Sequence, residues 1–219
     1  MPMSKKDKVK VEIWSDVMCP FCYIGKRNFE HALASFNEKE NVVIEWKSFQ
    51  LDPTVPHDLQ FEGDIYQYLA EKKGWSYEQS VQVHQQVVEM AAGVGLTYDF
   101  SKAKPANSLR AHLLIQLAKS KGLDDAMEEA LFKAYFTDGK DFGDVQELKL
   151  LGLEIGLSEI DMDMALQSEK FIDQVTTDIQ EGQQLGLTGV PFFVIDRKFA
   201  ISGAQPPEIF TQVLEKANQ

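Results

Sequence analysis

Apolar and polar residues alternate at the start of the chain and then recur at helical spacing over most of its length. Residues 8–14 carry Val or Ile at every second position, with Lys10 and Glu12 between them, which predicts a half-buried strand. Residues 20–38 repeat apolar side chains every three to four positions, which predicts a helix, and residues 41–49 are rich in β-branched and aromatic residues, which predicts a second strand. A connection of this length suits a right-handed βαβ unit, so we expect the two strands to be parallel.

Helical patterns then dominate for more than a hundred residues. A loop containing Pro53 and Pro56 follows the second strand, and glycine or proline separates most of the later segments. We expect helices over residues 62–73, 77–94, 106–121, 124–137, 145–155, 158–167 and 168–186.

Strand texture returns near the C-terminal end. Residues 190–195 and 199–202 predict a hairpin that turns at Asp196-Arg197, and Pro206 and Pro207 open a last helix that runs to about residue 216. The order of elements therefore predicts an α/β core that is interrupted by a large all-helical insertion domain. We place residues 1–56 and 170–219 in the core and residues 57–169 in the insertion.

Net charge and hydropathy argue against two classes of binding partner, nucleic acids and membranes. The 219 residues include 22 Lys and Arg against 34 Asp and Glu, a formal net charge of −12, which disfavours nucleic acid and anionic membranes. No apolar stretch is long enough to span a bilayer, and the basic residues 1–10 are followed by no apolar signal-peptide core. We therefore expect a cytoplasmic protein without nucleic-acid or membrane partners.

The chain has two cysteines, and both lie in the motif Cys19-Pro20-Phe21-Cys22 between the first strand and the first helix. Unpaired backbone N–H groups and the positive end of the helix dipole stabilise a thiolate at this position. Pro20 suits the first helical turn because it has no N–H to leave unpaired. A CxxC pair in this context is typical of a redox-active dithiol.

A second motif, Val190-Pro191, opens the strand of residues 190–195. A trans proline removes a donor from a strand, whereas a cis bond makes a tight bend, and cis bonds are nearly confined to X–Pro. We expect the cis isomer here. In that geometry Pro191 lies beside the thiols, and the Val190 backbone is free to pair with an incoming peptide as an added strand.

Several segments together resemble the DsbA-like branch of the thioredoxin superfamily, and within it the cytosolic FrnE-like disulfide oxidoreductases. The similarity covers nearly the whole chain. The segments that carry it are residues 15–25, which contain the CPFC motif, residues 189–195, residues 201–205, and residues 106–112, which begin a helix of the insertion.

The resemblance implies a thioredoxin-like fold interrupted by a helical domain, with Cys19 as the attacking thiol and Cys22 as the resolving thiol. It also places the helix that begins near Asn107 over the thiols, where His112 would stabilise the thiolate or move protons. The chemistry agrees, since Cys19 stands at the helix start and is expected to be the more exposed of the two. An ordinary helix N-cap at Asn107 and a hydrogen-bonded interface histidine at His112 remain the alternatives.

The expected activity is that of a protein disulfide reductase or isomerase. Phe21 packs against its surroundings and donates no hydrogen bond to sulfur, which favours a dithiol that is less oxidising than that of DsbA. The expected partners are protein or peptide thiols and disulfides, with glutathione or a thioredoxin-type protein as reductant. We expect no metal and no organic cofactor, because structural zinc needs four ligands and the histidines form no HxxxH pair near a second cysteine.

Two other functions stay open. A glutathione-dependent transferase or isomerase, of the kappa or 2-hydroxychromene-2-carboxylate type, would need a basic pocket, for which Lys26, Arg27 and Arg110 are the candidates. A redox-inactive peptide-binding module would use an aromatic groove instead.

The roles of two groups of residues are also open. Glu45 and Lys47 form either a buried proton relay or an exposed pair at the sheet edge. A set of aromatic residues either lines a peptide groove or fills a core, and its members are Phe21, Tyr23, Trp75, Tyr98 and Phe100.

Overall fold

The computed structural model describes residues 8–219, so the basic segment before residue 8 lies outside the described part. Four strands form one mixed sheet in the order β2-β1-β3-β4. Strand β1 (Val9–Ser15) pairs in parallel with β2 (Val42–Ser48), as predicted, from Val9 opposite Val42 to Ser15 opposite Ser48. Strand β3 (Phe192–Ile195) runs antiparallel to β1, and β4 (Phe199–Ser202) completes the predicted hairpin.

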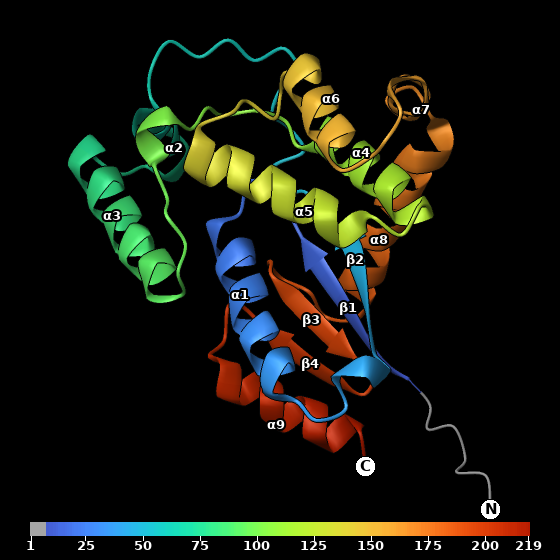
Figure 1. Cartoon of the computed structure of the whole chain (residues 1–219). Helices are drawn as coiled ribbons and strands as arrows, with labels where there is room; N and C mark the ends of the chain where they lie inside the picture. Colours follow the sequence, from blue (N-terminus) through green and yellow to red (C-terminus); the bar gives the residue numbers. More distant parts are fainter. Residues whose placement is uncertain (1–7) are drawn as a thin grey trace, which may run out of the picture.

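Helices cover both faces of this sheet. Helix α1 (Pro20–Ser35) and helix α9 (Pro207–Ala217) lie together on one face, where Phe29, Phe193 and Phe210 pack in contact (Figure 1). Helix α8 (Glu169–Gln184) packs against β2 on the other face. Because β1 is central, all of its side chains except Lys10 are buried.

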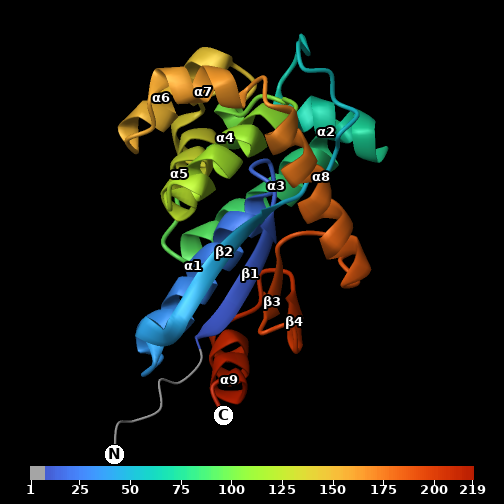
Figure 2. The same ribbon diagram turned by 90° about the vertical axis from the view of Figure 1, so that its right-hand side faces the viewer.

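The remaining helices lie between β2 and β3 in sequence and form the upper half of the molecule in Figure 2, beyond the end of β1 that leads into α1. We call this segment, residues 65–165, the helical insert. Helix α5 runs across the end of the sheet and continues into one π-helical turn, Ala134–Asp138. The insert comprises α2 (Ile65–Lys73), α3 (Tyr77–Gly93), α4 (Leu109–Ser120), α5 (Asp124–Lys133), α6 (Val145–Glu154) and α7 (Glu159–Ala165).

The predicted α/β fold with a helical interruption is therefore confirmed, and each predicted helix occurs within four residues of its expected ends. The caps explain several of these ends: Ser76 and Gln79 form a capping box at the start of α3. Among residues 8–219, no helix combines the length and hydrophobicity that crossing a membrane requires. The proposed domain boundaries at residues 56 and 169 stay a prediction.

One expectation about β1 is wrong. Glu12 was assigned to a polar, solvent-facing side of the strand, but its exposed fraction is 1%. The reason is its position in a central strand, where Arg197 from the β3–β4 turn binds its carboxylate. Asp196 and Arg197 have φ of 50° and 55°, so this turn holds two non-glycine residues in the left-handed region.

Candidate active site

Cys19 occupies the N-cap of α1, and Pro20 is the first helical residue. The extended backbone of Cys19 (φ −92°, ψ 110°) ends the loop from β1, and its N–H donates to the Asp16 carbonyl at 3.0 Å. The Cys22 N–H in turn donates to the Cys19 carbonyl at 3.0 Å. The Cys19 sulfur therefore lies at the positive end of a sixteen-residue helix, where a thiolate is stabilised.

The loop before β3 supplies the other side of the site. The Val190–Pro191 bond is cis, the isomer that the sequence favoured. The Cys19 thiol donates to the Val190 carbonyl with 3.4 Å between sulfur and oxygen. Two motifs that are 171 residues apart in the chain thus meet at one sulfur atom.

Both thiols are buried, and Cys19 is only slightly the more exposed of the two, which was the order expected. The exposed fraction of Cys19 is 3% and that of Cys22 is 1%. The contact with Val190 accounts for the burial of Cys19, because the loop before β3 lies on its sulfur. A substrate disulfide that reaches Cys19 must therefore displace the contact between this thiol and the loop.

Gly25, one turn after Cys22, lies against Pro191 of this loop. A Cβ atom at Gly25 would lie 3.0 Å from Pro191 Cγ, 3.4 Å from Phe193 Cζ and 3.5 Å from Ala204 Cα. The first distance is tighter than ordinary carbon–carbon contact. The absence of a side chain at this position sets how closely the helix and the loop approach.

The two thiols are chemically unequal. Burial raises the pKa of the Cys22 thiol well above its ordinary value, and the adjacent Cys19 sulfur raises it further, while hydrogen bonds from the Asp16 backbone and the Ser15 hydroxyl act in the opposite direction. Cys22 therefore keeps its proton at neutral pH. Cys19, at the helix N-terminus, is the sulfur that can attack first.

Four fully buried polar residues lie beside the thiols, and we call them the thiol-side cluster: Ser15, Asp16, His112 and Glu128. One carboxylate oxygen of Asp16 accepts from the Leu51 N–H at 2.6 Å, and the other lies 3.3 Å from His112 Nε2. Asp16 thereby ties the loop that carries Cys19 to the chain after β2 and to α4. His112 is hydrogen-bonded at the interface between the sheet and the helical insert, which is the alternative left open for it.

Asn107 has a related structural position. Ser108 stands at the N-cap of α4, yet the Asn107 side chain accepts from the Leu109 N–H at 2.8 Å and donates to the Val55 carbonyl at 2.6 Å. Gln50 also donates to it, at 3.2 Å. Asn107 thus fastens the loop after β2 to the start of α4.

The aromatic candidates divide into two groups. Tyr23, Tyr98 and Phe100 are buried, whereas Phe21 and Trp75 are each 38% exposed. The Tyr98 hydroxyl donates to the Pro20 carbonyl at 2.7 Å, and its ring stacks on Tyr23. Tyr98 therefore supports the first turn of α1 from the helical insert, and Phe21 is the aromatic residue of the motif that reaches the surface.

The basic residues that a glutathione pocket would need are occupied. Lys26 lies 3.0 Å from Glu129 and also pairs with Glu30, and Arg27 pairs with the same two glutamates. Arg110 donates only to backbone carbonyls, at 3.4 Å and 3.5 Å. Lys26 and Arg27 join α1 to α5, and within residues 8–219 both have carboxylate partners.

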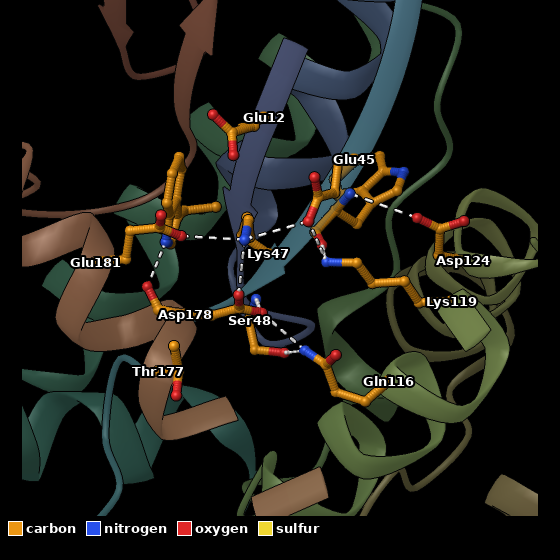
Figure 3. A network of polar contacts seen from close by, with 12 residues as sticks. Glu12, Glu45, Lys47, Ser48, Gln116, Lys119, Asp124, Thr177, Asp178 and Glu181 are labelled. Carbon is orange, nitrogen blue, oxygen red and sulfur yellow. Dashed lines mark hydrogen bonds and ion pairs between the residues drawn. The ribbon is translucent and has the colours of Figure 1, made fainter. Parts of the chain in front are cut away.

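Glu45 and Lys47 belong to a half-buried network on edge strand β2, which we call the sheet-edge network (Figure 3). Lys47 Nζ lies 3.2 Å from Glu45, 3.1 Å from Asp178 and 3.0 Å from Glu181. Lys119 from α4 binds Glu45 at 2.6 Å. The members are Glu45, Lys47, Lys119, Asp178 and Glu181, and none of them donates to or accepts from a cysteine among the described residues.

Residues 8–219 contain no group of three or more His, Cys, Asp or Glu side chains that could hold a metal ion. The sequence analysis did not single out Glu128. The available signal was its place on α5, where it stands one position after Met127 and three and four positions before Leu131 and Phe132, all buried. An acid on the apolar stripe of a helix must find a partner in the interior or lose its charge.

The chain is similar to a known protein family and to several solved structures. The family model for the DSBA-like thioredoxin domain matches residues 10–215. A solved structure described as a probable DsbA oxidoreductase from Streptomyces coelicolor is 38% identical, with a TM-score of 0.89, over 95% of this chain and 89% of that one.

Two more distant structures share the fold. The cytosolic disulfide reductase DsbM from Pseudomonas aeruginosa, also solved with glutathione, is 17% identical with a TM-score of 0.66, over 94% of this chain and 97% of its own. A 2-hydroxychromene-2-carboxylate isomerase is 14% identical with a TM-score of 0.67, over 94% of this chain and 95% of its own.

Proposed function

Because the chain belongs to the DSBA-like thioredoxin domain family, we propose that it is a thiol–disulfide oxidoreductase that acts on protein or peptide substrates through Cys19 and Cys22. Membership of this family supports oxidoreductase chemistry in general. The assignment of the two sulfurs rests on the site itself.

The observation that carries the proposal is the asymmetry of the dithiol. Cys19 stands at the helix N-terminus with its sulfur 3.4 Å from the Val190 carbonyl, while Cys22 is buried and its pKa is raised. The first sulfur is therefore the nucleophile, and the second is a protonated thiol held in reserve. This division of roles is what a mixed-disulfide mechanism requires.

The reaction proceeds in two exchanges. The Cys19 thiolate attacks one sulfur of a substrate disulfide, which forms a mixed disulfide and releases the other substrate sulfur as a thiol. Cys22 then loses its proton and attacks Cys19, which forms the Cys19–Cys22 disulfide and releases the second substrate sulfur. The substrate gains two electrons, the dithiol loses two, and a thiol reductant must restore it.

Backbone groups beside Cys19 are suited to hold the substrate chain. The Val190 carbonyl faces the reacting sulfur, and the Val190 N–H donates to no acceptor among the described residues. A peptide in extended conformation would pair with these groups as an added strand next to Pro191. Pro20 and the exposed ring of Phe21 would then contact the side chains that flank the substrate disulfide.

We favour reduction or isomerisation over net oxidation. Phe21 donates no hydrogen bond to sulfur, so the thiolate is less stabilised than with a polar residue between the cysteines. Such a dithiol stays reduced in a cytoplasmic thiol pool, which supports glutathione or a thioredoxin-type protein as the reductant. No metal or organic cofactor takes part in the proposed exchanges.

Insulin reduction and refolding of scrambled ribonuclease test the proposal, with wild type, Cys19→Ser and Cys22→Ser compared. We expect Cys19→Ser to lose activity by at least about 1000-fold, as loss of a nucleophile does. Cys22→Ser should accumulate a mixed disulfide with substrate, and dithiothreitol should reduce it.

Two outcomes would point to other functions. Client protection that is unchanged in Cys19→Ser would indicate a redox-inactive peptide-binding module. Turnover with glutathione that survives Cys22→Ser would indicate a transferase or isomerase, the chemistry of the more distant neighbour.

A further inference from the structure

The Tyr98 hydroxyl reaches the CPFC motif from the helical insert. It donates to the Pro20 carbonyl at 2.7 Å, across 78 residues of sequence. Tyr98 is 5% exposed, and its hydroxyl has no other hydrogen-bond partner among residues 8–219. A phenylalanine ring would fill the same space, so packing alone does not account for a buried hydroxyl at the first residue of α1.

The π-helical turn that follows α5 holds Tyr98 in this position. The Asp99 N–H donates to the Phe136 carbonyl at 2.7 Å, and the Thr137 hydroxyl donates to the Thr97 carbonyl at 2.7 Å. The backbone on both sides of Tyr98 is therefore bonded to this turn. The Tyr98 ring also stacks on Phe136, with 4.7 Å between the ring centroids. Turns of this kind often occur at functional sites.

The carbonyl that Tyr98 binds belongs to the same peptide group as the Phe21 N–H. The first N–H groups of a helix point back toward its N-cap residue, which here is Cys19. An N-cap side chain that accepts a hydrogen bond takes it from the second or third helical residue, and Phe21 is the second. The Phe21 ring donates nothing to sulfur, but the backbone N–H of Phe21 has no acceptor among the described residues and is free to donate.

Cys19 needs this donor only when it is ionised. The neutral thiol donates to the Val190 carbonyl, with 3.4 Å between sulfur and oxygen. A thiolate has no proton to donate, so it must accept a hydrogen bond instead. The Phe21 N–H is the free backbone donor that the N-cap position offers. The hydrogen bonds of Cys19 therefore change when the nucleophile forms.

We propose that Tyr98 is a positioning residue for the attack by Cys19: its hydroxyl polarises the peptide group whose N–H, that of Phe21, binds the Cys19 thiolate. This inference rests on the proposed function. A hydrogen bond to a carbonyl oxygen makes the N–H of the same peptide a stronger donor, because hydrogen bonds in a chain polarise one another. The helical insert thereby sets part of the reactivity of a sulfur that α1 carries.

Tyr98 acts without transferring a proton. Burial raises the pKa of its hydroxyl, and negative charge at Cys19 raises it further. The hydroxyl therefore stays protonated and donates to Pro20 throughout both exchanges. Its effect is on the free energy of the Cys19 thiolate, relative to the neutral thiol and to the disulfide.

Tyr135 provides a matched control for Tyr98→Phe. Tyr135 is buried, belongs to the π-helical turn, and donates its hydroxyl to the backbone carbonyl of Lys104 at 3.2 Å. That carbonyl lies outside the CPFC motif. Tyr135→Phe thus removes the same kind of hydrogen bond from the same turn, and any effect that both variants share comes from loosening the insert.

The rate at which iodoacetamide alkylates the reduced full-length protein, measured against pH, tests the inference. Cys22 is buried and protonated, so Cys19 is the thiol that reacts. Below the midpoint of the wild-type profile, Tyr98→Phe should react about threefold more slowly, because the hydrogen bond to the ionised sulfur is weaker. Above the midpoint it should react at least as fast as wild type, because a less stabilised thiolate is the better nucleophile. Tyr135→Phe should follow wild type at every pH.

The redox equilibrium with glutathione gives a second readout that packing alone would not move in this direction. Only the reduced protein contains the thiolate, so stabilising the thiolate favours the dithiol. Tyr98→Phe should therefore shift the equilibrium toward the Cys19–Cys22 disulfide, by up to about threefold at pH 7. Acid quenching and chromatography measure the ratio of the two forms. Tyr135→Phe should have the wild-type equilibrium constant.

Three results would overturn the inference: alkylation profiles that coincide for Tyr98→Phe and wild type, a rate that is lower by one factor at every pH, or an equilibrium shifted toward the dithiol. If Tyr98→Phe fails to fold by circular dichroism, Thr137→Val decides on the same criteria. It releases the loop that carries Tyr98 and should give a smaller effect in the same direction. Wild type that reduces no insulin would instead refute the proposed function, so the two failures are distinguishable.

Discussion

The thiol-side cluster and the sheet-edge network are both built from acids near α4, yet they differ in how their charges are balanced. In the sheet-edge network, Lys47 meets three carboxylates within 3.2 Å, and Glu45 also binds Lys119 (Figure 3). In the thiol-side cluster, Glu128 accepts from Ser15, and negative neighbours outnumber the one lysine that acts on it. The first has three acids and two lysines, and each acid is bound to a lysine, whereas Glu128 in the second is bound to no cation among the described residues.

This difference distinguishes buried polar groups that hold the fold together from buried polar groups whose protonation state can change. Paired charges hold elements together and resist a change of protonation, since either charge without its partner is costly. A buried carboxyl group that lacks a bound cation instead favours its neutral, protonated form, because burial disfavours the charge. The comparison yields predictions that differ in size and in sign.

The largest expected effect is on stability, from Asp178→Ala in the sheet-edge network. Asp178 binds Lys47 at 3.1 Å and accepts from the Ser48 N–H and from Gln116 at 3.0 Å and 2.7 Å. Removing it leaves three buried donors without this acceptor and should lower the free energy of unfolding by about 3 kcal/mol. Chemical denaturation measures the change, and the rate of insulin reduction by the folded variant should be unaltered. Asp138→Ala, at an exposed pair with Lys133, is the control and should change stability only slightly.

An intermediate effect, with a characteristic pH dependence, is expected for Glu128→Gln. The folded-state pKa of Glu128 is raised, so the wild-type protein loses stability as pH rises above the unfolded value of 4.5 toward the folded value. Glutamine does not titrate, so the variant should gain on wild type over this range, by about 1–3 kcal/mol at its upper end. Urea unfolding of both proteins from pH 4 to 9 tests this. A variant that loses stability relative to wild type as pH rises would contradict the unpaired character of Glu128.

The smallest effect has the opposite sign and concerns Glu45→Gln. Burial alone would raise the pKa of Glu45, but hydrogen bonds from Lys10 and Lys119 lower it to about 2. The stability that this carboxylate contributes is present above pH 4.5 and lost as pH falls toward 2. The variant should be about 1 kcal/mol less stable than wild type at pH 7, and the difference should disappear near pH 2.

Unfolding at pH 7, 4 and 2 measures this difference. Glu159→Gln, at a carboxylate that is 65% exposed, provides the baseline. A difference that grows on acidification would show that Glu45 is not held by its lysines.

Most of the fold was predictable because local signals and tertiary structure agree. Helix periods, caps and glycines set the ends of α1 to α9 to within a few residues. The failure at Glu12 has a physical cause: alternation along a strand reports one buried face, and it does not reveal that α8 and Arg197 cover the other. The turn at Asp196 and Arg197 was predicted from the sequence, although neither residue is glycine and both have positive φ.

The parts of the site that depend on short sequence motifs were predictable. Contacts between residues that are far apart in the sequence were not. The CPFC motif and Val190-Pro191 were found because each has a strong local context. Ser15 and Glu128 are 113 residues apart, and only tertiary packing brings them together. Lys26 was a candidate for the basic pocket of the alternative glutathione-dependent function, because its sequence position cannot reveal its partner Glu129 on α5.

Gly25 sets the distance between α1 and the loop that carries Pro191. Since a single methyl group there would meet Pro191 at 3.0 Å, the helix and the proline loop are spaced for a hydrogen atom. A larger residue at this position would require α1 or the loop to shift, and the spacing between the Cys19 sulfur and the Val190 carbonyl would change with it.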